Sequence, residues 1–150
     1  MTAFAIETLI EAPVERCFAL SLSIDAHTDS MAPSGERAIA GTTSGQIGPG
    51  ESVTWSARYF GVRFRMTSRI TTYEPPTRFI DEQTSGPFAR WWHEHEFHAV
   101  HDGTLMIDRI EFDAPFGALG RLAERLVLER YMQRLIRRRN AWLAEVLERR

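Results

Sequence analysis

Residues 90–112, RWWHEHEFHAVHDGTLMIDRIEF, decide the fold of this chain. Two runs in which apolar and polar residues alternate flank the dipeptide Asp102-Gly103, a strong signal for a two-residue hairpin turn. The sequence therefore predicts two long antiparallel strands with this dipeptide at their tip. The predicted cross-strand pairs are His101 with Thr104, Phe97 with Asp108, His95 with Ile110 and His93 with Phe112.

This register gives the hairpin two distinct faces. The reverse face sets Glu96 opposite Arg109, a favourable ion pair, and Glu94 opposite Glu111, a repulsion that only water makes tolerable. A turn shifted by one residue would mix apolar and charged side chains on both faces. The face expected to point inward carries Trp91, His93, His95, Phe97, Ala99, Met106, Asp108, Ile110 and Phe112.

A second hairpin is predicted upstream, with its turn at Phe60-Gly61. Its predicted pairs are Val53 with Ser68, Trp55 with Met66, Ala57 with Phe64 and Tyr59 with Val62. The opposite face carries Arg63, Arg65 and Arg69, which we interpret as a solvated outer surface rather than a phosphate-binding stripe. A short strand over residues 78–84 follows the break at Pro75-Pro76.

The two ends of the chain complete the prediction. Alternation over residues 3–11 indicates a half-buried strand, followed by a helix that begins at Pro13, a short helix over residues 24–30 and a brief strand over residues 37–40. Beyond Pro115 a leucine-rich stripe that includes Leu119, Leu122 and Leu126 predicts a long helix with a bend near Leu128. Arg137 to Arg139 are expected to complement the dipole of that helix.

The composition is that of an ordinary globular protein, with 150 residues, 43% hydrophobic residues and a formal charge of -2. One domain over residues 1–150 is expected. The charge gives no reason to expect a nucleic-acid or anionic membrane partner. Cys17 has no partner for an internal disulfide, the N-terminus has no signal-peptide pattern and no apolar run predicts a membrane span, so a cytoplasmic location is expected.

The order of these elements is that of the helix-grip fold, an α+β fold in which a curved antiparallel sheet of six to seven strands wraps on a long C-terminal helix. The chain resembles the SRPBCC superfamily, which includes START lipid-transfer domains and aromatic polyketide cyclases, and within it a bacterial ligand-binding branch. The resemblance implies a cavity between the sheet and the long helix. It rests on Ile10-Glu11-Ala12-Pro13, Phe18, Ile24-Asp25-Ala26-His27, Gly86-Pro87-Phe88, Trp91, His93, His95, Phe97, Gly103-Thr104, Met106, Asp108, Arg130-Tyr131-Met132 and Arg139-Asn140.

Aromatic and methionine side chains are expected to form the apolar walls of that cavity, since small-molecule sites are mostly apolar. The alternative is that the same side chains simply fill a core. The candidate wall residues are Trp55, Phe64, Met66, Trp91, Phe97, Met106, Ile110 and Phe112 from the sheet, with Met132 and Leu135 from the helix.

A polar cluster is predicted among these rings. His93, His95 and Asp108 share the inner face, and Asp81 and Gln83 join them if the preceding strand pairs with the same parity. A buried carboxylate requires a partner, which a histidine supplies. Three interpretations remain open: a hydrogen-bond network that orients a ligand, acid-base catalysis by an Asp-oriented histidine, or binding of Zn or Fe by His-x-His and a carboxylate.

The leading functional hypothesis is the binding of a small hydrophobic ligand, such as a lipid, an isoprenoid or an aromatic polyketide, without a cofactor. The alternative is a cyclase or dehydratase that uses His93 or His95 with Asp108 as its acid-base group. A third hypothesis is a filled core whose outer surface binds a protein partner, with a homodimer as one form. His27 is interpreted as a surface or capping residue, or else as a residue at the mouth of the cavity.

Overall fold

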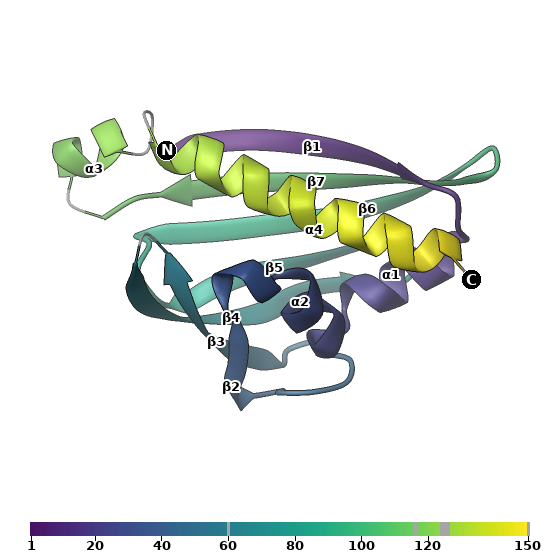
Figure 1. Ribbon diagram of the computed structural model, residues 1–150, viewed down its shortest axis with the longest axis horizontal. Coiled ribbons are helices and arrows are strands. Elements are labelled where there is room, and N and C mark those ends of the chain that lie inside the picture. Colours follow the sequence, from purple (N-terminus) through teal and green to yellow (C-terminus); the bar gives the residue numbers. More distant parts are fainter. Residues whose placement is uncertain (60, 116, 124–126, 150) are drawn as a thin grey trace.

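Figure 1 shows the computed structural model, which describes residues 1–59, 61–115, 117–123 and 127–149. The strands are β1 (Thr2–Ile10), β2 (Arg37–Gly41), β3 (Ser52–Tyr59), β4 (Val62–Glu74), β5 (Arg78–Ser85), β6 (Arg90–Val100) and β7 (Gly103–Asp113). The helices are α1 (Val14–Ser21), α2 (Ile24–Ser30), the short 3-10 helix η1 (Ala32–Ser34), α3 (Gly117–Ala123) and α4 (Glu129–Arg149).

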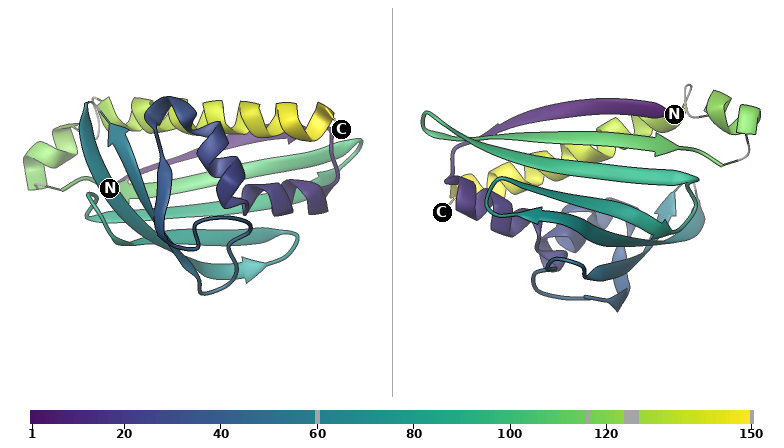
Figure 2. Two further views of the ribbon diagram at one scale, coloured as in Figure 1. Left: turned by 60° about the horizontal axis from the view of Figure 1, so that its bottom comes forward. Right: turned by 180° about the vertical axis from the view of Figure 1, so that it is seen from behind.

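The seven strands form one antiparallel sheet in the order β1-β7-β6-β5-β4-β3-β2. The sheet is curved, and α4 lies across its concave side with α1 and α2 beside it (Figures 1 and 2). This is the predicted α+β helix-grip arrangement, with two short helices after the first strand and a long helix at the C-terminal end.

The core lies between the sheet and the helices, because α4 presents an apolar stripe with helical spacing to the sheet. Two buried clusters fill this layer. The first joins α1 to the middle of the sheet and includes Cys17, Phe18, Phe79, Phe97, Met106 and Leu143. The second lies near the N-terminal half of α4 and includes Trp91, Ile110, Phe112, Met132, Leu135 and Ile136.

The predicted register of the β6–β7 hairpin is wrong by two residues. Val100 pairs with Gly103, so the turn is His101-Asp102, and His95 lies directly opposite Asp108. Asp102 itself takes the left-handed conformation, with φ 66°. Gly103 lies in β7 and not in the turn. A glycine is required there because a Cβ atom would lie 2.3 Å from the carbonyl oxygen of Ile10 in β1. The turn lies one residue earlier than predicted, which moves the partner of each residue by two positions, so every side chain keeps its predicted face. The expectation that a turn shifted by one residue would mix the faces is therefore wrong.

The charged reverse face of this hairpin is more favourable than predicted. Glu94, not Glu96, is the direct partner of Arg109, and Glu111 lies opposite Trp92. Arg109 contacts both glutamates, with its Nε atom 2.8 Å from Glu96 and 3.5 Å from Glu94. The predicted repulsion between Glu94 and Glu111 is therefore absent.

The pairing of the remaining strands agrees closely with the pairing predicted from the sequence. The β3–β4 hairpin has the predicted pairs, among them Trp55 with Met66 and Ala57 with Phe64. The arginines of its outer face, Arg63, Arg65 and Arg69, are exposed. In β5, Asp81 pairs with His93, which gives this strand the parity that brings Asp81 to the inner face.

The C-terminal region differs from its prediction at several positions. Its described residues form the helices α3 and α4, and the predicted stripe is wrong at Leu119 and Leu122, which are 73% and 54% exposed. Leu126 lies outside the described residues. Arg139 does not complement the dipole at the helix C-terminus as predicted, because it is buried on the face of α4 that packs against the sheet. Among the described residues no helix is long and apolar enough to cross a membrane.

Candidate functional site

A cavity of about 140 Å³ lies between the sheet, α2 and α4. Its wall is mostly apolar, and the polar side chains are gathered on two parts of it. Nine of the predicted site residues line it: Trp55, Phe64, Met66, Asp81, Trp91, His93, His95, Met132 and Leu135. The sequence therefore placed the cavity on the correct face of the sheet.

The other six predicted site residues lie outside the wall. Phe97, Met106, Ile110 and Phe112 are at most 1% exposed and belong to the two core clusters. The side-chain amide of Gln83 donates a hydrogen bond to the carbonyl of Phe88 and accepts one from the Phe88 N–H. Gln83 thus stabilises the loop between β5 and β6. Asp108 is buried behind the imidazoles of His93 and His95.

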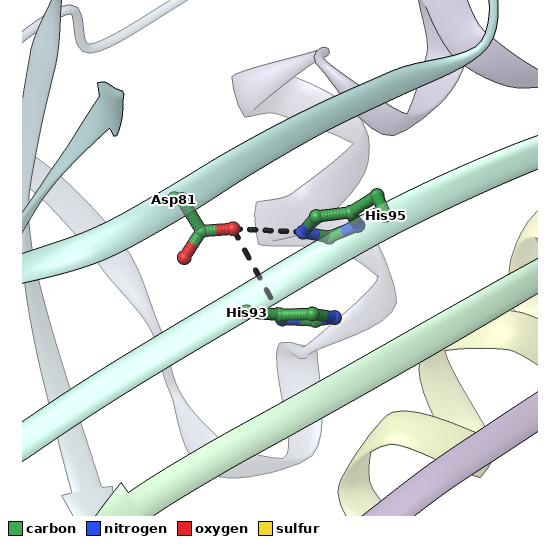
Figure 3. A group of neighbouring side chains, drawn as sticks. All are labelled: Asp81, His93 and His95. Carbon is green, nitrogen blue, oxygen red and sulfur yellow. Dashed lines mark hydrogen bonds and ion pairs between the residues drawn. The ribbon is translucent and has the colours of Figure 1, made fainter. Parts of the chain in front are cut away.

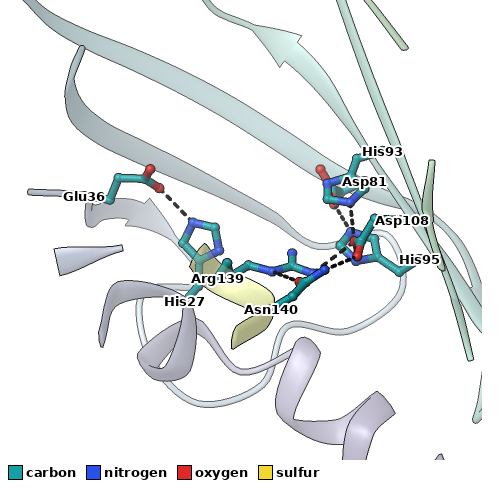
Figure 4. A network of polar contacts seen from close by, with 8 residues as sticks. All are labelled: His27, Glu36, Asp81, His93, His95, Asp108, Arg139 and Asn140. Atoms are coloured by element: carbon teal, nitrogen blue, oxygen red, sulfur yellow. Dashed lines mark hydrogen bonds and ion pairs between the residues drawn. The ribbon is translucent and has the colours of Figure 1, made fainter. Parts of the chain in front are cut away.

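Asp108 is the centre of a buried polar network that ties β7 to β6 and α4 (Figure 4). Its carboxylate accepts hydrogen bonds from His93 Nε2 at 2.7 Å, from Arg139 Nη2 at 3.0 Å and from Asn140 Nδ2 at 2.7 Å. Burial opposes its ionisation, but the charge of Arg139 and the bond from His93 outweigh it and hold the pKa of Asp108 well below its ordinary value. Asp108 is therefore a carboxylate at neutral pH.

Asp81 lies on β5 beside the two imidazoles, which stack with their ring centroids 3.7 Å apart (Figure 3). Its Oδ2 atom is 2.7 Å from His95 Nε2 and 4.0 Å from His93 Nδ1. Burial opposes ionisation of Asp81 too, yet the hydrogen bond from His95 and the charges of both histidines lower its pKa. Asp81 is also the more accessible of the two carboxylates, with 23% of its side chain exposed.

His95 is the least satisfied polar group of the site. Burial, followed by the neighbouring charge of His93, lowers the pKa of His95 to about 4, so its imidazole is neutral near pH 7. Its Nδ1 atom is buried without a hydrogen-bond partner and lies 3.5 Å from Asp108 Oδ1. Leaving a buried polar atom unsatisfied costs free energy.

A second polar group lies on another part of the cavity wall. His27 of α2 is 2.7 Å from the buried carboxylate of Glu36, which also accepts a hydrogen bond from Ser34 Oγ at 3.2 Å. The His27 ring also packs against Trp55 at a tilt of 36°, with centroids 4.3 Å apart. Of the two interpretations open for His27, the structure favours the position at the cavity.

Sequence reasoning missed the roles of Arg139, Asn140 and Glu36. A signal for the first two was present, because Arg139 and Asn140 lie one helical turn from Ile136 and Leu143 and so fall on the apolar stripe of α4. A polar pair on a buried stripe implies a buried partner, here Asp108. Glu36 had no such signal, since it lies in a loop before a short strand.

The comparisons with known proteins agree with this fold. The sequence profile of the family described as polyketide cyclase / dehydrase and lipid transport matches residues 1–148. No sequence among the curated proteins matches the chain.

Many solved structures share the fold. The Zhui aromatase/cyclase from Streptomyces sp. R1128 superposes with a TM-score of 0.79 at 15% identity, covering 99% of this chain and 94% of that one. The protein TTHA0849 from Thermus thermophilus gives 0.78 at 18% identity, covering 96% and 95%. A START superfamily protein from Mycobacterium smegmatis gives 0.72 at 11% identity, covering 96% and 98%. At these identities the likeness concerns the fold.

Proposed function

The chain belongs to the polyketide cyclase, dehydrase and lipid-transport family of the SRPBCC superfamily, and from this premise we propose that its cavity binds a small aromatic molecule that carries a hydroxyl group. The observation that carries the proposal is the wall itself, in which aromatic and methionine side chains surround His93 and Asp81. Apolar rings supply most of the contact area, and the few polar groups orient the ligand.

The size of the cavity limits the ligand. An apolar cavity of roughly 150 Å³ accommodates one benzene ring, and the space here is about 140 Å³. A single substituted ring therefore fits without rearrangement. A long-chain lipid, an isoprenoid or a multi-ring polyketide is larger than this space.

The polar wall selects for a hydrogen-bond donor. His93 donates its Nε2 proton to the carboxylate of Asp108, and in the tautomer that carries only this proton the Nδ1 atom is an acceptor. Asp81 adds carboxylate oxygens 4.0 Å away. Arg139, the cation on this wall, already donates to Asp108 and Asn140. A phenolic hydroxyl is thus favoured over a carboxylate, which Asp81 would repel.

The second candidate function is that of a cyclase or dehydratase. The pairing of Asp108 with His93 at 2.7 Å supports it, because a carboxylate-oriented imidazole on a cavity wall suits proton transfer to or from a carbonyl substrate. Under this hypothesis His93→Ala or Asp108→Asn abolishes turnover. A bound hydroxylated carbonyl compound that is recovered chemically unchanged after long incubation with the protein would contradict it.

Matched ligands test the binding proposal. Calorimetric titration should show that p-cresol binds about 10-fold more tightly than p-xylene, since p-xylene leaves the polar wall unpaired. Leu135→Trp fills the cavity and should abolish binding, whereas Arg137→Trp, on the exposed side of the same helix, should not. Equal affinities for p-cresol and p-xylene would refute recognition of the hydroxyl, and no binding by either compound would refute the proposal as a whole.

A further inference from the structure

We propose that Asp81, His93 and His95 form a binding site for one divalent transition-metal ion of the Zn²⁺ type. Two imidazole nitrogens and one carboxylate oxygen are ligands that such ions accept, with further positions left for water or an exogenous ligand. The proposal does not depend on the bound organic molecule proposed above.

The geometry of the three side chains suits a metal ion. One ligand atom from each of them lies within 4.8 Å of the others. The Oδ2 atom of Asp81 is 2.7 Å from His95 Nε2 and 4.0 Å from His93 Nδ1. Tetrahedral ligands at normal zinc distances lie about 3.4 Å apart, so the two separations bracket the required value. Figure 3 shows the two stacked imidazoles beside this one carboxylate.

The carboxylate of Asp108 provides the support that metal-binding histidines usually have. A ligating histidine commonly donates its other ring N–H to a carboxylate, which fixes the tautomer and orients the ring. His93 has this arrangement, because its Nε2 atom is 2.7 Å from Asp108 Oδ1. The Nδ1 atom of His93, 4.0 Å from Asp81 Oδ2, is then the ring nitrogen available to a metal ion.

The orphan Nδ1 atom of His95 is the observation that favours a cation over a plain hydrogen-bond network. If His95 Nε2 donates to Asp81, its Nδ1 lone pair is buried 3.5 Å from the Asp108 carboxylate with no donor to satisfy it. If a metal ion takes the Nε2 lone pair, the proton moves to Nδ1 and the N–H faces Asp108. The metal ion thus converts an unfavourable contact into a favourable one.

The surrounding charges permit a cation at this position. Arg139 is the cation that reaches the cluster, and it is bound to Asp108 at 3.0 Å, so the charge of Asp81 remains to offset the metal. Aromatic rings enclose the imidazoles: Phe79 stacks on His95 at 4.1 Å and Trp91 meets the edge of His93 at 6.3 Å. Because all three proposed ligands line the cavity, the free coordination positions open into it.

The test uses the full chain without a polyhistidine tag, stripped with EDTA and titrated with Zn²⁺ in the absence of organic ligands. One ion should bind per chain and raise the melting temperature, and EDTA should reverse both effects. Asp81→Asn and His95→Gln should each weaken binding by about 100-fold. His27→Gln, which alters the other histidine-carboxylate pair of the cavity, and the surface variant His98→Gln/His101→Gln should bind as the wild type does.

A measurement on the wild type removes any dependence on how the variants fold. In NMR spectra of the imidazole nitrogens, Zn²⁺ should shift the signals of His93 and His95 and leave those of His27, His98 and His101 in place. No binding of Zn²⁺ to the stripped protein would overturn the proposal. So would binding that survives both Asp81→Asn and His95→Gln, or shifts confined to His98 and His101. Since no organic ligand is present, these outcomes are separate from failure of the proposed function.

Discussion

The guanidinium of Arg139 donates to the carboxylate of Asp108 at 3.0 Å, with the two side chains 7% and 0% exposed. This ion pair joins the long helix α4 to strand β7 at the centre of the molecule. It also fixes the charge of Asp108, and through His93 it sets the orientation of the imidazoles on the cavity wall. The helix and the site are thus connected through one carboxylate.

Removal of the Arg139 charge should destabilise the protein strongly. Arg139→Met leaves the Asp108 carboxylate buried without its cation, and we expect the free energy of unfolding to fall by about 3–5 kcal/mol in urea titrations. Arg138→Met is the matched control, because Arg138 is exposed one position earlier on the same helix, and its effect should be within about 0.5 kcal/mol. Equal effects of the two substitutions would show that the buried pair has no special role.

A methyl group at Gly103 should disturb the junction of β1 and β7. In Gly103→Ala the new Cβ atom would lie 2.3 Å from the carbonyl oxygen of Ile10 and 3.2 Å from the Cα atom of Glu11, so backbone must shift. We expect a loss of about 1–3 kcal/mol in the free energy of unfolding. Gly48→Ala, whose Cβ atom would meet the Glu51 carboxylate at 3.4 Å, is the control and should be nearly neutral. A stable Gly103→Ala protein would contradict the register described here.

Substitution of a core residue should mainly reduce stability, whereas substitution of a residue of the cavity wall should mainly reduce ligand affinity. Phe97 is 1% exposed and packs against Phe18 and Phe79, so Phe97→Ala should cost about 3–5 kcal/mol of unfolding free energy. Trp55 lines the cavity and is only partly buried, so Trp55→Ala should cost about 1–2 kcal/mol but weaken p-cresol binding about 10-fold. Paired urea and calorimetric titrations measure both quantities. If the folded Phe97→Ala protein loses more affinity than Trp55→Ala does, the assignment of core and wall is wrong.

Cys17 should react slowly in the folded protein. Its side chain is 0% exposed, and burial raises the pKa of the thiol, so at pH 8 the reactive thiolate is scarcer than in the unfolded chain. We expect iodoacetamide to label native protein slower by about two orders of magnitude or more than protein in urea. Because the sequence has one cysteine, mass spectrometry gives the labelled fraction directly. Rapid labelling of native protein would show that α1 opens frequently.

The sequence by itself determined the strands and the faces of the sheet. Alternation with a period of two places Trp91, His93 and His95 on one side of β6 whatever the exact pairing, because a shift of two residues leaves each side chain on its face. For the same reason it found His93, His95 and Asp108 on the inner face although the predicted turn was displaced. Helical spacing likewise placed Met132 and Leu135 against the sheet.

Only the tertiary structure decided which inward side chains are wall and which are core. Phe97 and Trp91 share a face of β6, yet Phe97 is covered by α1 while Trp91 borders the cavity, a difference set by where the helices lie over the curved sheet. The partnership of Asp108 with Arg139 spans 31 positions of the chain, and the register depends on the approach of Ile10 to Gly103. Such contacts join segments distant in sequence, so local periodicity carries no information about them.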